Sequence, residues 1–150
     1  MNNIVSGLEA IIETYKPLLL EISNDAWIKE PAPGKWSKKQ ELGHTIDSAQ
    51  NNIRRFIVGQ HQEQPYIVYQ QDQWVAISNY QDYPVNDLIE LWVLLNKHIC
   101  IILKNTSVEK ANRLVLTQDL HSILWLAADY NKHLLHHLHH VLELEPAAYP

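Results

Sequence analysis

Apolar residues recur every three or four positions in four long stretches of this chain. The first stretch contains Ile4, Leu8, Ile11, Ile12, Tyr15, Leu18, Leu19 and Ile22. An α-helix turns once every 3.6 residues, so this spacing places all of these side chains on one face. No comparable series of alternating apolar and polar residues indicates a β-sheet. We therefore predict an all-α fold, a four-helix bundle.

Capping and breaking residues mark the ends of the predicted helices. The run Ser23-Asn24-Asp25 ends the first helix, in which Pro17 can introduce a kink. Ser37 is the expected N-cap of the second helix, because Gln40 stands where it completes a capping box. The predicted ranges are 4–22, 37–59, 86–104 and 119–144, with Pro146 just beyond the last helix.

A long connection, residues 60–84, separates the second predicted helix from the third. It is polar and aromatic, and it contains the segment YIVY, which is also compatible with a short strand. We favour an irregular excursion with a helical turn around residues 72–78. Connections of this length are usually functional or cover another part of the molecule.

Length and charge limit the classes of protein to consider. The chain has 150 residues, which fits a single domain over residues 1–150, and its formal net charge is −5. That charge argues against nucleic acid or an anionic membrane surface as a partner. The longest apolar region, 88–103, contains charged residues and is too short to span a bilayer. The single cysteine and the absence of a signal-peptide pattern at the start favour a cytoplasmic protein.

Five of the nine histidines lie in the stretch HLLHHLHH, residues 133–140. Histidines four apart on a helix share a face, so His133 with His137, and His136 with His140, are both possible metal-binding pairs. The buried face of the same predicted helix is a leucine stripe made of Leu120, Ile123, Leu124, Ala127, Leu134, Leu135, Leu138, Val141 and Leu142. On a helical wheel the first pair lies at about 220° and 260° from this leucine stripe, and the second at about 160° and 200°. The first pair flanks the apolar stripe and is better placed to meet another helix.

A metal site needs a third ligand, and the remaining candidates are His44, His61, His98 and His121. On the wheel of the second helix, His44 lies roughly 200° from the apolar stripe. That position predicts a site at the edge of the bundle, under the long connection or a partner subunit, rather than deep in the core.

Two motifs resemble those of the DinB/YfiT superfamily. They are WSKKQELGHTIDSAQNNIRRF, residues 36–56, and LWLAADYNKHLLHHLHHV, residues 124–141, which contains a DYxxHxxHH pattern. The resemblance covers nearly the whole chain and implies a four-helix bundle with a divalent metal on three histidines, here His44, His133 and His137. It also implies a homodimer. Members are described as metal-dependent hydrolases, and others as transferases or isomerases that use low-molecular-weight thiols.

Three histidine ligands leave a coordination position open for water or substrate, as in catalytic metal sites. Zinc or nickel is expected first, with iron or manganese as further options. The metal could activate water for hydrolysis of a small molecule, or hold a low-molecular-weight thiol as the nucleophile for transfer. Asp47 and Asp129 are candidates for a general base or for orienting a ligand ring, and the sequence assigns neither role. The alternative is a non-catalytic metal- or ligand-binding bundle in a stress response.

The other notable side chains are expected to have structural or surface roles. His136, His139 and His140 are expected at the solvated surface, and His61, His98 and His121 are expected to be structural or exposed. Cys100 is expected to be a small buried hydrophobe rather than a nucleophile. Trp74, Tyr80 and Tyr83 either line the mouth of a pocket or pack the long connection down.

Overall fold

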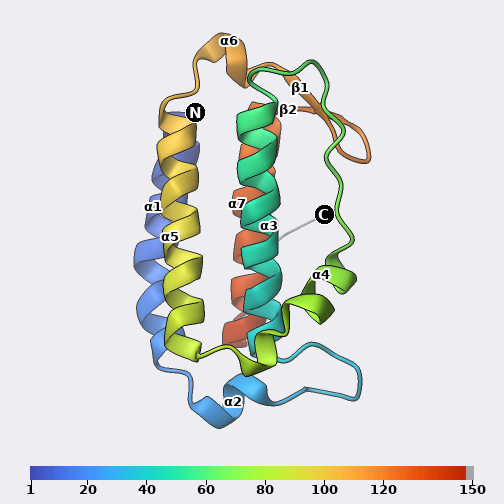
Figure 1. Cartoon of the computed structure of the whole chain (residues 1–150). Helices are drawn as coiled ribbons and strands as arrows, with labels where there is room; N and C mark the ends of the chain where they lie inside the picture. The colour runs from blue at the N-terminus through green and yellow to red at the C-terminus, as the bar shows by residue number, and fades with distance from the viewer. Residues whose placement is uncertain (148–150) are drawn as a thin grey trace.

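A computed structural model describes residues 1–147 of the chain. Four long helices form the body of the molecule (Figure 1). They are α1 (Asn2–Leu20), α3 (Lys38–Val58), α5 (Val85–Lys104) and α7 (Ile123–Leu142). The helix α1 packs against α5 and α7, and α3 packs against the same two helices. The predicted four-helix bundle is confirmed.

Buried apolar side chains from all four long helices fill the centre of the bundle. The largest buried side chains of the molecule include Trp27, Phe56, Trp92 and Tyr130. The Tyr130 hydroxyl donates a hydrogen bond to Asn96 Oδ1 at 2.7 Å, and Asn96 Nδ2 donates to the Trp92 carbonyl, so the polar groups of both buried side chains have partners. Within residues 1–147, no helix combines the length and apolar character needed to cross a membrane.

The helix α3 begins and ends at the residues that the sequence singled out, whereas α1 ends two residues earlier than predicted. The helix α1 continues through Pro17 to Leu20, and Ser23 then caps the short helix α2 (Asn24–Ile28). At the start of α3, Ser37 and Gln40 form both hydrogen bonds of the predicted capping box. Gly59 is the C-cap of α3, as expected.

The last long helix begins later than predicted, at Ile123 instead of about Asp119. The residues before it form strand β2 (Leu120–Ser122), which pairs antiparallel with β1 (Leu114–Leu116) after the short helix α6 (Val108–Ala111). The Ser122 hydroxyl then accepts a hydrogen bond from the Trp125 backbone N–H and caps α7. Backbone pairing in this small hairpin therefore replaces the first helical turn.

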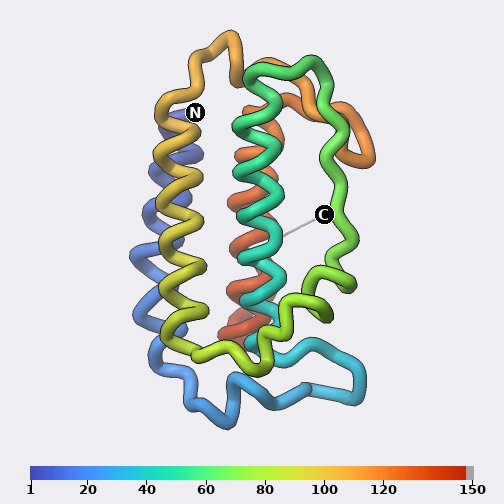
Figure 2. The backbone as a smooth tube through the Cα atoms, viewed as in Figure 1, coloured from blue at the N-terminus to red at the C-terminus, as the bar shows by residue number. Residues whose placement is uncertain are grey.

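Residues 59–84 connect α3 to α5 along the outer side of α3 (Figure 2). They contain α4 (Gln71–Ser78), where the sequence indicated a helical turn, and the 3₁₀ helix η1 (Tyr80–Asp82). The YIVY segment makes one isolated parallel bridge, between Tyr66 and Leu116, rather than a strand. Both α4 and η1 pack on α3, so this helix is covered on its outer side as well as on its bundle side.

Candidate metal centre

Three histidines meet between α3 and α7. His133 Nε2 lies 3.2 Å from His44 Nε2 and 3.0 Å from His137 Nε2. The three ligand atoms all lie within 4.8 Å of one another. His44 comes from α3, and the other two come from successive turns of α7. The structure thus brings together the three residues that the sequence proposed as ligands.

The arrangement of these three nitrogens fits a divalent metal ion. Tetrahedral coordination at about 2.1 Å places ligand nitrogens roughly 3.4 Å apart, close to the two measured contacts. Neutral imidazole has one N–H, and a hydrogen on His133 Nε2 can serve only one of its two neighbours at a time. A cation would accept all three lone pairs together, so the donor set suits a metal better than a hydrogen-bonded cluster.

Burial and repulsion between neighbouring imidazoles favour the neutral forms of His44 and His133. Burial, followed by the positive charges of His137 and His44, lowers the pKa of His133 to about 2. Burial and the charge of His137 lower the pKa of His44 to about 4. At neutral pH both imidazoles are therefore neutral, which is the form that binds a metal.

His44 is more deeply buried than the helical wheel indicated. Its side chain is 1% exposed, although the wheel placed it away from the apolar stripe of its helix. Trp36 packs on one side of the His44 ring, with ring centroids 5.1 Å apart, and His137 packs on another at 4.6 Å. His44 is therefore not an exposed residue. Val68, Tyr69 and Gln71 of the long connection line a cleft that His133 and His137 also border, which agrees with a site under that connection.

Glu41 supports the site, although its role was not predicted from the sequence. Its Oε1 atom accepts a hydrogen bond from His137 Nδ1 at 2.5 Å, and both side chains are about 15% exposed or less. Burial alone would raise the pKa of Glu41, but the hydrogen bond and charge of His137 hold it below its ordinary value. A carboxylate on Nδ1 fixes the hydrogen there and directs the Nε2 lone pair toward the other histidines.

A cleft of about 490 Å³ opens beside the three histidines. His133 and His137 form part of its wall, together with Arg55, Asp129 and Trp125. Arg55 is held in place because its Nε and Nη2 atoms donate to the Ile67 carbonyl at 3.2 Å. The volume lies in the range typical of small-molecule sites.

The two candidate bases lie in different surroundings. Asp129 faces the cleft with His133. Asp47 is fully buried, and its Oδ1 accepts a hydrogen bond from the Tyr80 hydroxyl at 2.5 Å. Burial raises the pKa of Asp47 to about 6, although the Tyr80 hydrogen bond opposes that shift. Asp47 is therefore enclosed by η1, whereas Asp129 lies in the wall of the cleft.

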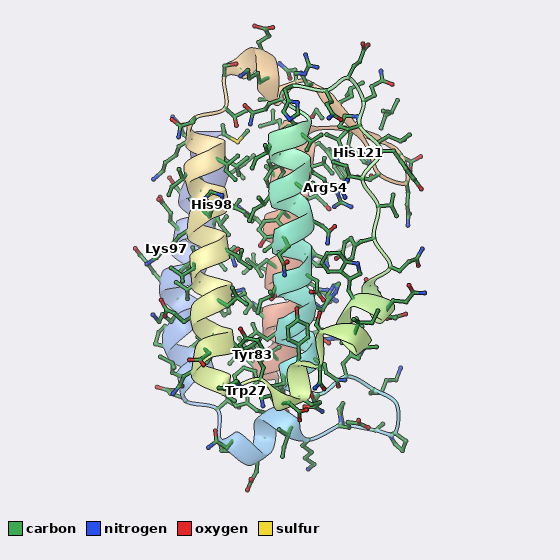
Figure 3. The ribbon with its side chains drawn as sticks, viewed as in Figure 1. Trp27, Arg54, Tyr83, Lys97, His98 and His121 are labelled. Atoms are coloured by element: carbon green, nitrogen blue, oxygen red, sulfur yellow. The ribbon has the colours of Figure 1, made fainter. Side chains whose placement is uncertain are left out.

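The remaining histidines follow the sequence expectations in part. His61, His98 and His140 are exposed, and Figure 3 shows His98 on α5 and His121 near the hairpin. His121 stacks on Trp125 with ring centroids 3.7 Å apart. His136 and His139 are half-buried rather than solvated, since His136 packs beside His137 and His139 shares a 2.7 Å hydrogen bond with the Tyr15 hydroxyl.

Cys100 and the aromatic residues of the connection also have defined places. Cys100 is buried in the core, where burial raises its thiol pKa to about 11, as expected of a small hydrophobe. Tyr80 is buried against α3, and Tyr83 packs against the core. Trp74 packs against Tyr69 with ring centroids 5.5 Å apart and remains 36% exposed.

The sequence profile of the DinB superfamily matches residues 8–141. The chain belongs to this superfamily. The matched region includes both histidine motifs, so the predicted relationship is confirmed. Comparison with functionally curated proteins gives no significant sequence match.

Solved structures show the same DinB-superfamily fold. YfiT from Bacillus subtilis, described as a probable metal-dependent hydrolase with an unusual four-helix bundle topology, aligns with a TM-score of 0.84 at 19% identity. The alignment covers 95% of this chain and 83% of YfiT. A mycothiol-dependent maleylpyruvate isomerase aligns with a TM-score of 0.72 at 15% identity, over 98% of this chain and 61% of the isomerase. A DinB-like protein of Bacillus subtilis, YjoA, aligns with a TM-score of 0.66 at 19% identity. This alignment covers 98% of this chain and 97% of YjoA.

Proposed function

We propose that His44, His133 and His137 hold a divalent metal ion and that the chain is a metal-dependent enzyme acting on a small molecule. The observation that carries this proposal is the convergence of three histidine Nε2 atoms beside a 490 Å³ cleft. Zinc or nickel suits such a histidine set first, and iron or manganese next. A structural metal site usually has four protein ligands, whereas three leave a position for a reactant.

A metal held here would supply Lewis-acid chemistry, lowering the pKa of bound water or of a low-molecular-weight thiol. The residues of the chain have three separate tasks in this proposal. The histidines present their lone pairs to one point, and Glu41 keeps the hydrogen of His137 on Nδ1. Asp129, in the wall of the same cleft, is placed to accept a proton from the attacking water or thiol.

Two proteins of similar structure support this function class. YfiT is described as a probable metal-dependent hydrolase, and the isomerase as mycothiol-dependent. We propose a hydrolysis or a thiol transfer for this chain on the same grounds. We also propose that residues 1–150 form a single domain and that the protein is a cytoplasmic homodimer. Light scattering on purified protein would measure the mass of that assembly.

The function is tested by turnover assays on metal-loaded protein. Ester and amide hydrolysis would be screened in parallel with transfer of small thiols to electrophiles. We expect one class of activity in the wild type, its loss in His133→Ala, and at least a roughly tenfold decrease of kcat in Asp129→Asn with unchanged metal content. Full metal occupancy without turnover in any assay would favour a non-catalytic metal- or ligand-binding bundle instead.

A further inference from the structure

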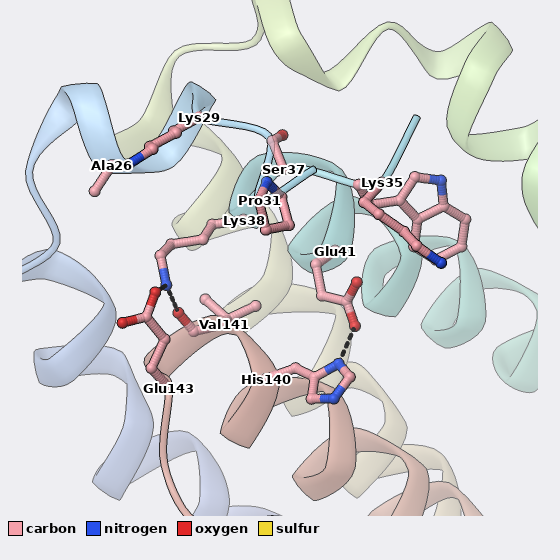
Figure 4. A pocket seen from close by; sticks show the side chains of 11 residues that line it. Ala26, Lys29, Pro31, Lys35, Ser37, Lys38, Glu41, His140, Val141 and Glu143 are labelled. Atoms are coloured by element: carbon pink, nitrogen blue, oxygen red, sulfur yellow. Dashed lines mark hydrogen bonds and ion pairs between the residues drawn. The ribbon is translucent and has the colours of Figure 1, made fainter. Parts of the chain in front are cut away.

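A second cavity lies on the other side of Glu41, outside the cleft that His133 and His137 border. It measures about 600 Å³ and lies between α2, the loop that leads into α3, and the end of α7 (Figure 4). Glu41 forms part of its wall, and the Glu41 carboxylate binds His137 on the metal side. The cavity is therefore a neighbour of the metal centre, separated from it by one side chain.

Positive charge gathers around this cavity in a chain that is acidic as a whole. Lys29, Lys35 and Lys38 all belong to its lining. Lys38 is held in place, because its Nζ donates to the Val141 carbonyl at 2.5 Å and to Glu143 Oε1 at 2.8 Å. Lys29 and Lys35 make no ion pair with another residue of the described range 1–147.

The carboxylates of the cavity already have partners. Glu143 forms an ion pair with Lys38, and the hydrogen bond from Lys38 is the main cause that lowers the pKa of Glu143. Glu41 accepts the 2.5 Å hydrogen bond from His137, and His140 Nδ1 lies 3.5 Å from the same oxygen. The lining thus contains three lysines and two engaged carboxylates, so it carries a positive excess.

The rest of the wall is apolar. Ala26, Pro31, Trp36 and Val141 line the cavity together with the aliphatic parts of the lysines. The Trp36 ring also packs against His44. Small-molecule sites combine a volume of this size, a mainly apolar wall and a few charged groups that fix orientation. A bare inorganic anion would interact with the positive charge but would make no contact with the apolar part of the wall.

We propose that this cavity is a binding site for a small organic carboxylate, with its apolar body against Trp36 and Val141 and its negative charge attracted by the positive excess of the lysines in the lining. The site is separate from the three histidines and does not require a metal. Binding there is therefore independent of the function proposed above.

The test is a calorimetric titration of the full chain with 2-naphthoate in the presence of EDTA. We expect saturable binding with a Kd of about 1 mM or lower, the range for a ligand of this size. The double substitution Lys29→Gln/Lys35→Gln should weaken binding about tenfold, because it removes the two unpaired ammonium groups. Both lysines are exposed, so the variant keeps its fold.

Two control variants distinguish binding in this cavity from a general charge effect and from binding in the metal cleft. Lys97→Gln/Lys132→Gln removes the same charge from exposed positions outside the cavity and should leave the Kd within about twofold. His133→Ala should also leave it unchanged. No saturation at about 10 mM, or equal affinity in both lysine variants, would overturn the proposal. Loss of binding in His133→Ala would place the carboxylate in the metal cleft and would overturn it as well.

Discussion

His133 is the residue on which the other two histidines converge, since its Nε2 contacts both of theirs. The sequence pointed to it through two independent signals, the i, i+4 spacing to His137 and the position of that pair beside the leucine stripe. Spacing alone left His136 and His140 as an equal alternative. The structure places His140 at the surface and brings His44, not a third histidine of α7, to His133 and His137.

The position of Glu41 on the same helix face as His44 could have been predicted from the sequence, but its hydrogen-bond partner could not. It precedes His44 by three residues on the same helix, so both point toward α7. The carboxylates that the sequence did single out, Asp47 and Asp129, lie one in each motif. Which ring nitrogen a carboxylate reaches depends on the side-chain rotamers of two helices, and a helical wheel does not contain that information.

Replacing Glu41 should weaken metal binding without unfolding the chain. Loss of a carboxylate that orients a ligand histidine typically lowers metal affinity about 10- to 100-fold. We expect an effect of about this size on the zinc Kd of Glu41→Ala, measured by competition with a chromophoric chelator. Glu143→Ala, a carboxylate at the same end of the molecule that touches no ligand, is the matched control. Equal zinc affinity in both variants would show that Glu41 does not position His137.

Asp47 should make stability depend on pH in a defined direction. Its pKa is about 6 in the folded chain against an ordinary value of 3.8, so the folded state holds the proton more tightly. This contribution to the free energy of unfolding is fully present below about pH 4 and is lost as pH rises through about 6. The shift corresponds to about 3 kcal/mol.

The pH dependence is measured by urea unfolding of the wild type and Asp47→Asn between about pH 4 and 7, in EDTA. The histidines with lowered pKa act in the opposite direction, so the difference between the two proteins is the informative quantity. We expect the free energy of unfolding of Asp47→Asn to increase relative to that of the wild type as pH rises. Asp25→Asn, which removes an exposed carboxylate, is the control. A constant difference across this range would contradict a buried, protonated Asp47.

At the scale of elements, the helix α3 shows what periodicity can and cannot predict. Its capping box and its end at Gly59 are local features, and the sequence predicted both. The surroundings of His44 come from other segments, namely Trp36 in the preceding loop and His133 and His137 of α7. Local spacing does not reveal which distant segment covers a polar face. The hairpin before α7 was missed for a related reason, since three-residue strands are too short to show alternation.

The approach of η1 to α3 depends on Gly43. A Cβ atom at this position would lie 2.1 Å from Tyr80 Cδ2, so any side chain collides with a buried ring. We expect Gly43→Ala to lower the free energy of unfolding by about 1–3 kcal/mol, because η1 has to move. Gly7→Ala is the matched control, because a Cβ atom there would lie 3.3 Å from its nearest neighbour, Asn131 Nδ2. The higher helix propensity of alanine opposes the small cost of this contact.

Both glycine variants would be compared by urea unfolding and by their metal content. Tyr80 packs directly beside the residue that precedes His44, so Gly43→Ala should weaken metal binding as well as stability. Equal stability of Gly43→Ala and Gly7→Ala would mean that η1 does not pack tightly on α3.

For the whole molecule, the fold and the candidate site rest on different interactions. The core consists of apolar side chains from all four long helices, whereas the three histidines occupy one contact between α3 and α7. The apolar spacing was sufficient to predict the bundle, because each stripe has to be buried against the others. The same separation means that the chain should remain folded without metal, and that a metal would add stability by binding only the folded state.

The most direct test of the metal centre is the metal content of untagged protein purified without a nickel column. Elemental mass spectrometry would be applied to the wild type and to His44→Ala, with circular dichroism to show that both are helical. We predict about one zinc, nickel, iron or manganese ion per chain in the wild type and none in the folded variant. No stoichiometric metal in the wild type, or the same content in His44→Ala, would contradict a metal held between α3 and α7.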